Sequence, residues 1–221
     1  MTVQSTGIGT DNIDIVVNEL DALANIDFET RTEKAEKTRL TLVRLGTCGG
    51  IQPELRIGDL VLSRISAGFD GLLNFYKGRN AVCDLEMEQD FVEHTGWSRL
   101  LTAPYFVRCS DYLAELFAPD TVEGMTASAP GFYAPQGRYL RLAPADRRLN
   151  EKIESFEYGG HRFTNFEMEG SALAGLSRLM GHDAVTICTV IAQRVALESD
   201  TDYRPFVDKM IATCLEKLAG I

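Results

Sequence analysis

Continuous apolar runs recur along the chain, and runs of this length between turn residues are typical of buried strands. Four such strands are predicted, at residues 40–47, from about Asp59 onward, at 102–110 and at 184–194. The opening stretch TVQSTGIGT predicts the end of one more strand, followed by a glycine-containing turn. The longest apolar run, around residues 184–192, is far too short to cross a bilayer, so no membrane contact is predicted.

Apolar residues spaced by about one helical turn predict helices between these strands. The first helix, with Thr10 or Asp11 as its expected cap, has an apolar face made of Ile13, Val16, Leu20 and Leu23. Further helices are predicted at residues 86–102, 111–117, 169–182 and 205–220. Asp111 is expected to cap the third helix and Gly181 to close the fourth. Strands that alternate with helices indicate an α/β fold.

Length, charge and cysteine content narrow the class of protein. The chain has 221 residues without an internal repeat or a shift in composition, which predicts a single domain over residues 1–221. A net charge of −10 argues against binding to nucleic acid or to an anionic membrane. The five cysteines are irregularly spaced, with no metal-like cluster, which predicts a reducing, cytoplasmic compartment and no metal site.

The segment RLGTCGG, residues 44–50, carries the first candidate chemistry. Arg44 lies in an otherwise apolar strand, where a buried guanidinium needs an anionic partner. The glycines after it let backbone N–H groups approach a ligand closely, and Thr47 adds a hydroxyl donor. The segment therefore predicts an oxyanion or phosphate pocket. Its alternative is a strand arginine paired with a structural carboxylate, followed by a plain tight turn.

The same segment contains the pattern G-x-C-x-G around Cys48, which raises the alternative of a cysteine hydrolase. That chemistry needs a helix directly after the cysteine and a histidine base. Here Pro53 and a further strand follow, and the only histidines are His94, His161 and His182. A small buried cysteine is the favoured interpretation of Cys48.

Three further segments offer groups that are typical of ligand-binding sites. In GFYAPQGRY, the Gln136 amide and the Arg138 guanidinium can hydrogen-bond a planar heterocycle, and Phe132 or Tyr133 can stack on it. In FEMEGS, Glu167 and Glu169 share one side of an extended chain and can grip a vicinal diol, although charge at a helix start is a sufficient explanation. Arg194 ends a buried strand, a usual ligand position in α/β sheets; the alternative is a surface arginine that begins a loop.

Taken together, these segments resemble the nucleoside phosphorylase family, in particular its uridine phosphorylases. The matching stretches are STGIG at 5–9, RLGTCGGIQPELRIGDLVL at 44–62, GFYAPQGRY at 131–139, NFEMEGSALAGL at 165–176 and VIAQR at 190–194. Their order and spacing fit the family across nearly the whole chain. The glycine-rich piece alone is weakly specific, whereas the combination of R-x-G-T-x-G, F-Y-x-x-Q-x-R and E-M-E is specific.

The resemblance implies a role for each segment. It assigns phosphate to Arg44 and Thr47, and it assigns the uracil ring to Phe132, Gln136 and Arg138, with Arg194 beside them. It assigns the ribose to Met168 and Glu169, with Glu167 supporting them or contacting the sugar. Catalysis would rest on Arg44, Arg138 and Glu169. The purine branch of the family has an Asp after the late strand, and IAQR has none, which favours a pyrimidine.

The implied reaction is the phosphorolysis of uridine to uracil and ribose 1-phosphate, with inorganic phosphate as co-substrate and no metal or organic cofactor. The implied fold is a mixed sheet flanked by helices, in homodimers that often form hexamers. The family carries further strands and a phosphate-binding Arg before the region matched by STGIG, and they are not in this sequence. The alternative is therefore a shortened, catalytically impaired protein that binds a nucleoside or nucleobase.

Overall fold

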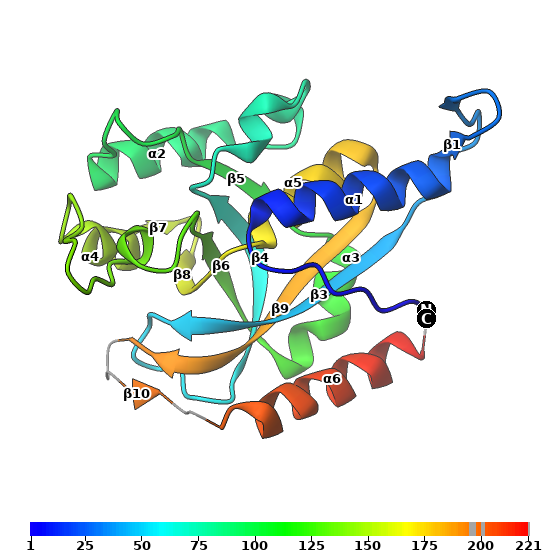
Figure 1. The fold of residues 1–221 in the computed structure, drawn as a ribbon. Helices are drawn as coiled ribbons and strands as arrows, with labels where there is room; N and C mark the ends of the chain where they lie inside the picture. The colour runs from blue at the N-terminus through cyan, green and yellow to red at the C-terminus, as the bar shows by residue number, and fades with distance from the viewer. Residues whose placement is uncertain (195–197, 200–201, 221) are drawn as a thin grey trace.

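The computed structural model describes residues 1–194, 198–199 and 202–220, and a mixed sheet runs through its centre (Figure 1). The order of the strands is β10-β9-β3-β8-β6-β4-β5, with β7 beside β8 and a further pairing of β9 with β4. They are β3 (Thr41–Gly50), β4 (Leu60–Gly68), β5 (Tyr105–Arg108), β6 (Val122–Ser128), β7 (Glu157–Tyr158), β8 (His161–Glu167), β9 (Asp183–Gln193) and β10 (Glu198–Ser199). The short strands β1 (Ile26–Asp27) and β2 (Thr32–Glu33) pair separately.

Helices cover both faces of the sheet, which confirms the α/β class and the mixed sheet flanked by helices (Figure 1). They are α1 (Thr10–Asn25), α2 (Leu85–Thr95), α3 (Asp111–Phe117), α4 (Leu149–Glu154), α5 (Gly170–Met180) and α6 (Arg204–Leu218). Helices α1 and α5 pack on one face, where Ile13, Val17 and Leu176 are buried together. Helices α3 and α6 pack on the other, around Leu62 and Ile187. No described helix is long and apolar enough to cross a membrane.

Strand β3 decides which side chains reach the α1–α5 face. It runs parallel to β9, with Arg44 opposite Thr186 and Gly46 opposite Cys188. Val43 and Leu45 pack with α3 and α6, so strand alternation turns Arg44 toward α1 and α5. On the edge away from β9, the described ladder pairs of β3 lie only at Gly49 and Gly50, with β8.

All four predicted apolar strands are confirmed, as β3, β4, β5 and β9. The fifth is wrong: residues 1–6 form no strand, because no described strand pairs with them, and most are exposed. The Gly- and Pro-rich stretch at 126–139 begins inside β6, which extends to Ser128. Strands β6 and β8 were not predicted, because buried polar side chains interrupt their apolar pattern. Two of these side chains, Thr126 and Asn165, are joined by a hydrogen bond.

The predicted helices exist, but several of their ends differ. Gly9 precedes α1 and Ser110 precedes α3, and neither helix has a side-chain cap, so the caps assigned to Thr10, Asp11 and Asp111 are wrong. Helix α2 ends at Thr95, well before residue 102, because Gly96 adopts a left-handed conformation with φ of 59°. The predicted closure of α5 by Gly181 is confirmed, with φ of 81°.

The apolar face of α1 is rotated from its predicted position. Ile13 is buried, but its partner is Val17 rather than Val16, and Leu23 is 66% exposed. This face is set by the surface of α5, against which α1 packs, rather than by the apolar residues of α1 alone.

A cluster of aromatic rings forms the core between α2, α4 and the sheet. Phe91 is fully buried at its centre, with its ring 5.2 Å from that of Phe106, 5.2 Å from that of Phe156 and 5.7 Å from that of Phe163. Removing such a ring loses the transfer free energy of the side chain and leaves a cavity.

We therefore expect Phe91→Ala to lower the free energy of unfolding by about 3–5 kcal/mol. The matched control is Phe75→Ala, since Phe75 is 88% exposed; its effect should stay within about 0.5 kcal/mol. Urea unfolding followed by circular dichroism measures both, and equal losses in the two variants would contradict the position of this cluster in the core.

Candidate functional site

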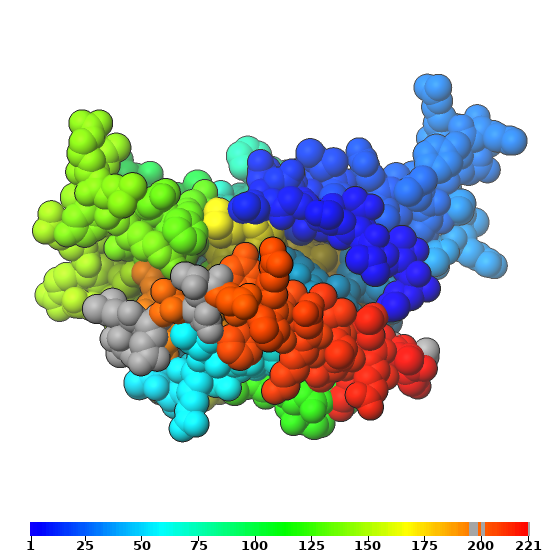
Figure 2. Space-filling view, turned by 60° about the horizontal axis from the view of Figure 1, so that its bottom comes forward, coloured from blue at the N-terminus to red at the C-terminus, as the bar shows by residue number. Residues whose placement is uncertain are grey.

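The predicted site residues gather where β6 and β8 end beside β3, below the first turns of α1 and α5. In the space-filling view, a hollow separates the N-terminal segment from α6, and the light blue of β3 lies in its floor (Figure 2). Glu167 is the last residue of β8, and Glu169 directly precedes α5. The E-M-E segment is therefore a junction between strand and helix, of which the sequence predicted the helix but not the strand.

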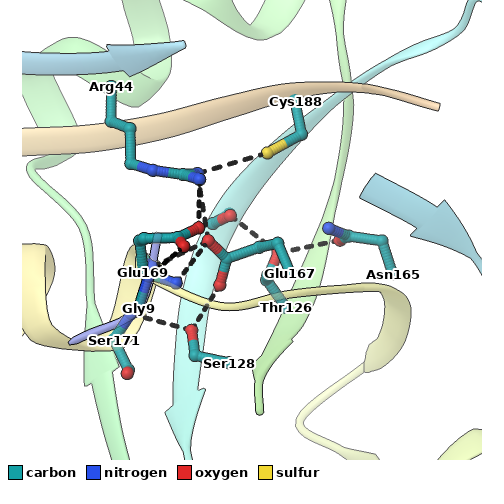
Figure 3. Close-up of polar contacts among 11 residues, drawn as sticks. Gly9, Arg44, Thr126, Ser128, Asn165, Glu167, Glu169, Ser171 and Cys188 are labelled. Carbon is teal, nitrogen blue, oxygen red and sulfur yellow. Dashed lines mark hydrogen bonds and ion pairs between the residues drawn. The ribbon is translucent and has the colours of Figure 1, made fainter. Parts of the chain in front are cut away.

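Glu167 is a buried, fully hydrogen-bonded carboxylate (Figure 3). One oxygen accepts from the Ser128 hydroxyl at 2.5 Å. The other accepts from the backbone N–H groups of Glu169 and Gly170, at 2.9 and 2.8 Å, and lies 3.0 Å from a guanidinium nitrogen of Arg44. The amides belong to the start of α5, where negative charge is stabilising. Glu167 thus caps α5 and has little capacity left for a ligand.

Arg44 is the centre of a cluster with Glu167 and Glu169, because its guanidinium contacts both carboxylates. It pairs with Glu167 and, through Nη2, with Glu169. Burial opposes its charge, but the neighbouring carboxylates more than compensate and raise the pKa of Arg44 above its ordinary value. The guanidinium folds over Gly46, where a Cβ would lie 2.8 Å from both terminal nitrogens. Gly46 therefore provides the space that Arg44 occupies.

Glu169 is held from two sides by groups of positive character. One oxygen accepts from the backbone N–H of Gly9, at the start of α1, at 2.6 Å, and the other contacts Arg44. Burial raises the pKa of Glu169, Arg44 lowers it, and the nearby charge of Glu167 raises it further. Two carboxylates thus share one guanidinium, and Glu169 is the less completely satisfied of the two.

The structure argues against a nucleophilic Cys48. Its thiol is buried, and burial raises its pKa well above the usual value, so little thiolate would form. Strand β3 continues through it to Gly50, so no nucleophile elbow exists. His94 contacts α4, and His182 lies 3.1 Å from Asp21. His161 lies at the start of β8 and lacks a contact with Cys48 in the part of the chain described.

A second group of predicted residues surrounds Gln136. Its side chain is buried, and its amide oxygen accepts from Arg138, whose guanidinium lies 4.1 Å from the centre of the Phe132 ring. Arg194 donates to the Gln136 backbone carbonyl and lies over the ring of Phe166 at 4.9 Å. The four predicted base-binding residues, Phe132, Gln136, Arg138 and Arg194, are therefore brought together.

Both guanidinium groups are partly buried without a close carboxylate. Burial lowers the pKa of Arg138. Burial, reinforced by the charge of Arg138, lowers the pKa of Arg194 to about 10. Neither group forms an ion pair with any described residue, and Nη1 of Arg194 is buried without a partner among them. This region therefore has donors and positive charge to offer an electron-rich ligand.

Strand β3 lies beside both groups of residues. A Cβ at Gly49 would lie 3.2 Å from Cδ of Arg194 and 3.5 Å from Nη2 of Arg138. Gly46 lies three positions earlier, or about 10 Å along a strand, against Arg44. That separation suits a base at one end and a sugar at the other.

Two predicted residues are less closely involved in the cluster. Met168 is half-buried between the two glutamates. Thr47 follows Arg44 by three positions, so strand alternation directs its side chain to the other face, and it lacks a hydrogen bond to the cluster among the residues described. Its assignment to phosphate stays a prediction.

Sequence reasoning missed the residues that hold this cluster in place. Ser128 and Gly9 contact the two glutamates, and Nη1 of Arg44 donates to the thiol of Cys188 at 3.5 Å. Only Gly9 carried a recognisable signal, since a glycine before a helix exposes its backbone N–H groups. In the described residues no group of three or more His, Cys, Asp or Glu side chains is placed to hold a metal ion.

Comparison with known proteins relates the whole chain to one family. The family model of the phosphorylase superfamily matches residues 1–221. A uridine phosphorylase of Thermococcus kodakarensis is 30% identical over 206 residues, which cover 90% of this chain and 60% of the relative. A DeoD-type purine nucleoside phosphorylase of Hahella chejuensis is 25% identical and aligns with 100% of this chain and 75% of its own length.

A solved structure agrees in fold. A nucleoside phosphorylase of Trypanosoma brucei, described as showing uridine phosphorylase activity, superposes with a TM-score of 0.83 at 26% identity. The match covers 98% of this chain and 79% of that one. The chain thus spans only part of each relative, and 60% of the Thermococcus enzyme.

The contacts of the Ser128 hydroxyl predict that this residue contributes to the stability of the fold. Its hydroxyl donates to Glu167 and accepts from the backbone N–H of Ser171 at 2.9 Å. Ser128→Ala would leave a buried N–H and a carboxylate oxygen each short of a partner, at about 1–3 kcal/mol for each group. Urea unfolding should show this loss, and exposed Ser5→Ala should show almost none. An unchanged midpoint for Ser128→Ala would refute the role of this hydroxyl.

Proposed function

The chain belongs to the phosphorylase superfamily, and from this membership we propose that it cleaves the glycosidic bond of a pyrimidine nucleoside, with uridine as the first candidate. Inorganic phosphate would be the second substrate, and uracil and ribose 1-phosphate would be the products. This reaction would serve pyrimidine salvage. The homodimer or dimer-built hexamer, and the cytoplasm as compartment, stay predictions.

The observation that carries this proposal is the arrangement of Arg138 and Arg194 around the buried Gln136. Two guanidinium groups without an ion pair among the described residues lie beside an amide and an aromatic ring. A uracil ring offers two carbonyl oxygens and an N–H at its edge, and a flat face for Phe132. Gln136 can both donate and accept, while each arginine only donates, which suits the two carbonyls.

In the proposed reaction, a phosphate oxygen attacks C1′ of the ribose as the bond to the base nitrogen breaks. The electron pair of that bond passes to the uracil ring, which leaves with negative charge on its carbonyl oxygens. Arg138 and Gln136 stabilise this charge at a partly buried site, where hydrogen bonds are stronger than in water. Glu169 accepts hydrogen bonds from the ribose diol, with Met168 against the sugar. Arg44 positions the phosphate.

Two comparisons bear on the choice of base. The Thermococcus relative is named a uridine phosphorylase, whereas the Hahella relative is named a purine enzyme. The IAQR stretch at 191–194 lacks the acidic residue that a purine base would call for, which favours a pyrimidine. A matched panel of uridine, deoxyuridine, thymidine and inosine therefore tests the specificity.

A binding protein without turnover is the second candidate, and one observation favours it. Arg44, the proposed phosphate residue, is already paired with two carboxylates. Uracil release that requires both uridine and phosphate supports the enzyme. Uridine binding without release, in the presence of phosphate, supports the second candidate.

We expect Arg138→Ala to lower phosphate-dependent uracil release by about 100- to 1,000-fold, because one donor to the developing charge is lost. The matched control is Arg141→Ala, which removes an exposed guanidinium three residues along the same loop and should leave the rate unchanged. Absorbance of released uracil measures both. Equal rates in the wild type and Arg138→Ala would exclude the proposed base pocket.

A further inference from the structure

The Arg44 cluster, made of Arg44, Glu167 and Glu169, carries an excess of negative charge. With both carboxylates ionised, one buried guanidinium faces two negative charges. Such an arrangement is costly, because like charges repel strongly where water is excluded. Adding a phosphate next to Arg44 would bring still more negative charge to the same place.

The two carboxylates differ in how firmly they are held. Glu167 accepts from the Ser128 hydroxyl and two backbone amides in addition to Arg44. Glu169 has the Gly9 N–H and Arg44. Displacing Glu167 would therefore break the cap of α5, whereas displacing Glu169 breaks two contacts. Glu169 is the carboxylate that can move.

The partners of Glu169 are the donors that an oxyanion would use. A guanidinium binds phosphate oxygens through two parallel N–H groups, and an amide at the start of a helix offers another donor. A third donor lies close by, because the Thr186 hydroxyl is buried without a partner among the described residues. A Cβ at Gly170 would lie 3.3 Å from that hydroxyl and 3.2 Å from Glu167, so the hydroxyl borders the same cluster.

We propose that Glu169 and an oxyanion compete for the guanidinium of Arg44 and the N–H of Gly9, and that a bound oxyanion displaces Glu169 toward the ribose position. The displaced carboxylate can then accept hydrogen bonds from the sugar diol. Oxyanion and nucleoside would therefore bind cooperatively, each favouring the arrangement that the other needs. This inference rests on the proposed function, because it assumes that Arg44 receives the phosphate.

Sulfate tests the displacement without turnover, since it carries two charges and resembles phosphate. Glu169→Gln removes the competing charge and keeps the shape of the side chain. We expect this variant to bind sulfate at least about tenfold more tightly than the wild type in calorimetric titration, a difference of about 1.4 kcal/mol. The control Glu115→Gln removes the same charge from an exposed position and should match the wild type.

The proposal is overturned if Glu169→Gln binds sulfate no more tightly than the wild type, or if neither protein binds sulfate. A second measurement uses the unchanged protein, in case the variant does not fold. Uridine affinity should rise severalfold when sulfate is present, and sulfate affinity should rise by the same factor with uridine. Independent or competitive binding would overturn the proposal. If uracil release is absent but binding is cooperative, the proposed phosphorolysis is rejected and the displacement of Glu169 stands.

Discussion

The buried guanidinium of Arg44 is the group on which the arrangement of the site depends. It contacts the end of β8 through Glu167 and the start of α5 through Glu169, while Glu169 also binds the first amide of α1. A buried cation is tolerated only when its partners are in place, so these four elements must meet in one geometry. The contacts of Arg44 with the two glutamates therefore join the sheet to both helices on its α1–α5 face.

The two glutamates of the E-M-E segment have different environments, although their spacing suggested a shared ligand. Both contact Arg44, as residues on one side of an extended chain should. Glu167 is committed to the amides of α5, which is the structural explanation for a charge at a helix start. The Glu169 side chain instead contacts Arg44 and the Gly9 N–H, and among the described residues it accepts no hydrogen bond from the amides of α5. One segment thus supplies both a cap and a candidate ligand group.

The sequence predicted the long apolar strands and singled out Arg44 for the same physical reason. A buried strand needs a continuous apolar run, so the arginine within such a run in β3 stands out against it. The pattern could not show which carboxylate pairs with Arg44, because Glu169 lies 125 residues away along the chain. Nor could it show β6 and β8, since these strands bury polar residues such as Thr126 and Asn165, which are joined by a hydrogen bond only in the folded chain. Such pairs become visible only in three dimensions.

The Arg44 cluster and the group of residues around Gln136 are linked by the backbone of β3 rather than by a shared side chain. Because Gly46 has no side chain, the Arg44 guanidinium fits against it. In the same way, Gly49 leaves room for Arg194 and Arg138. A larger residue at either position would need a cationic side chain to shift, and each of these cations has a defined set of contacts. The glycines therefore determine how closely three positive groups approach one strand.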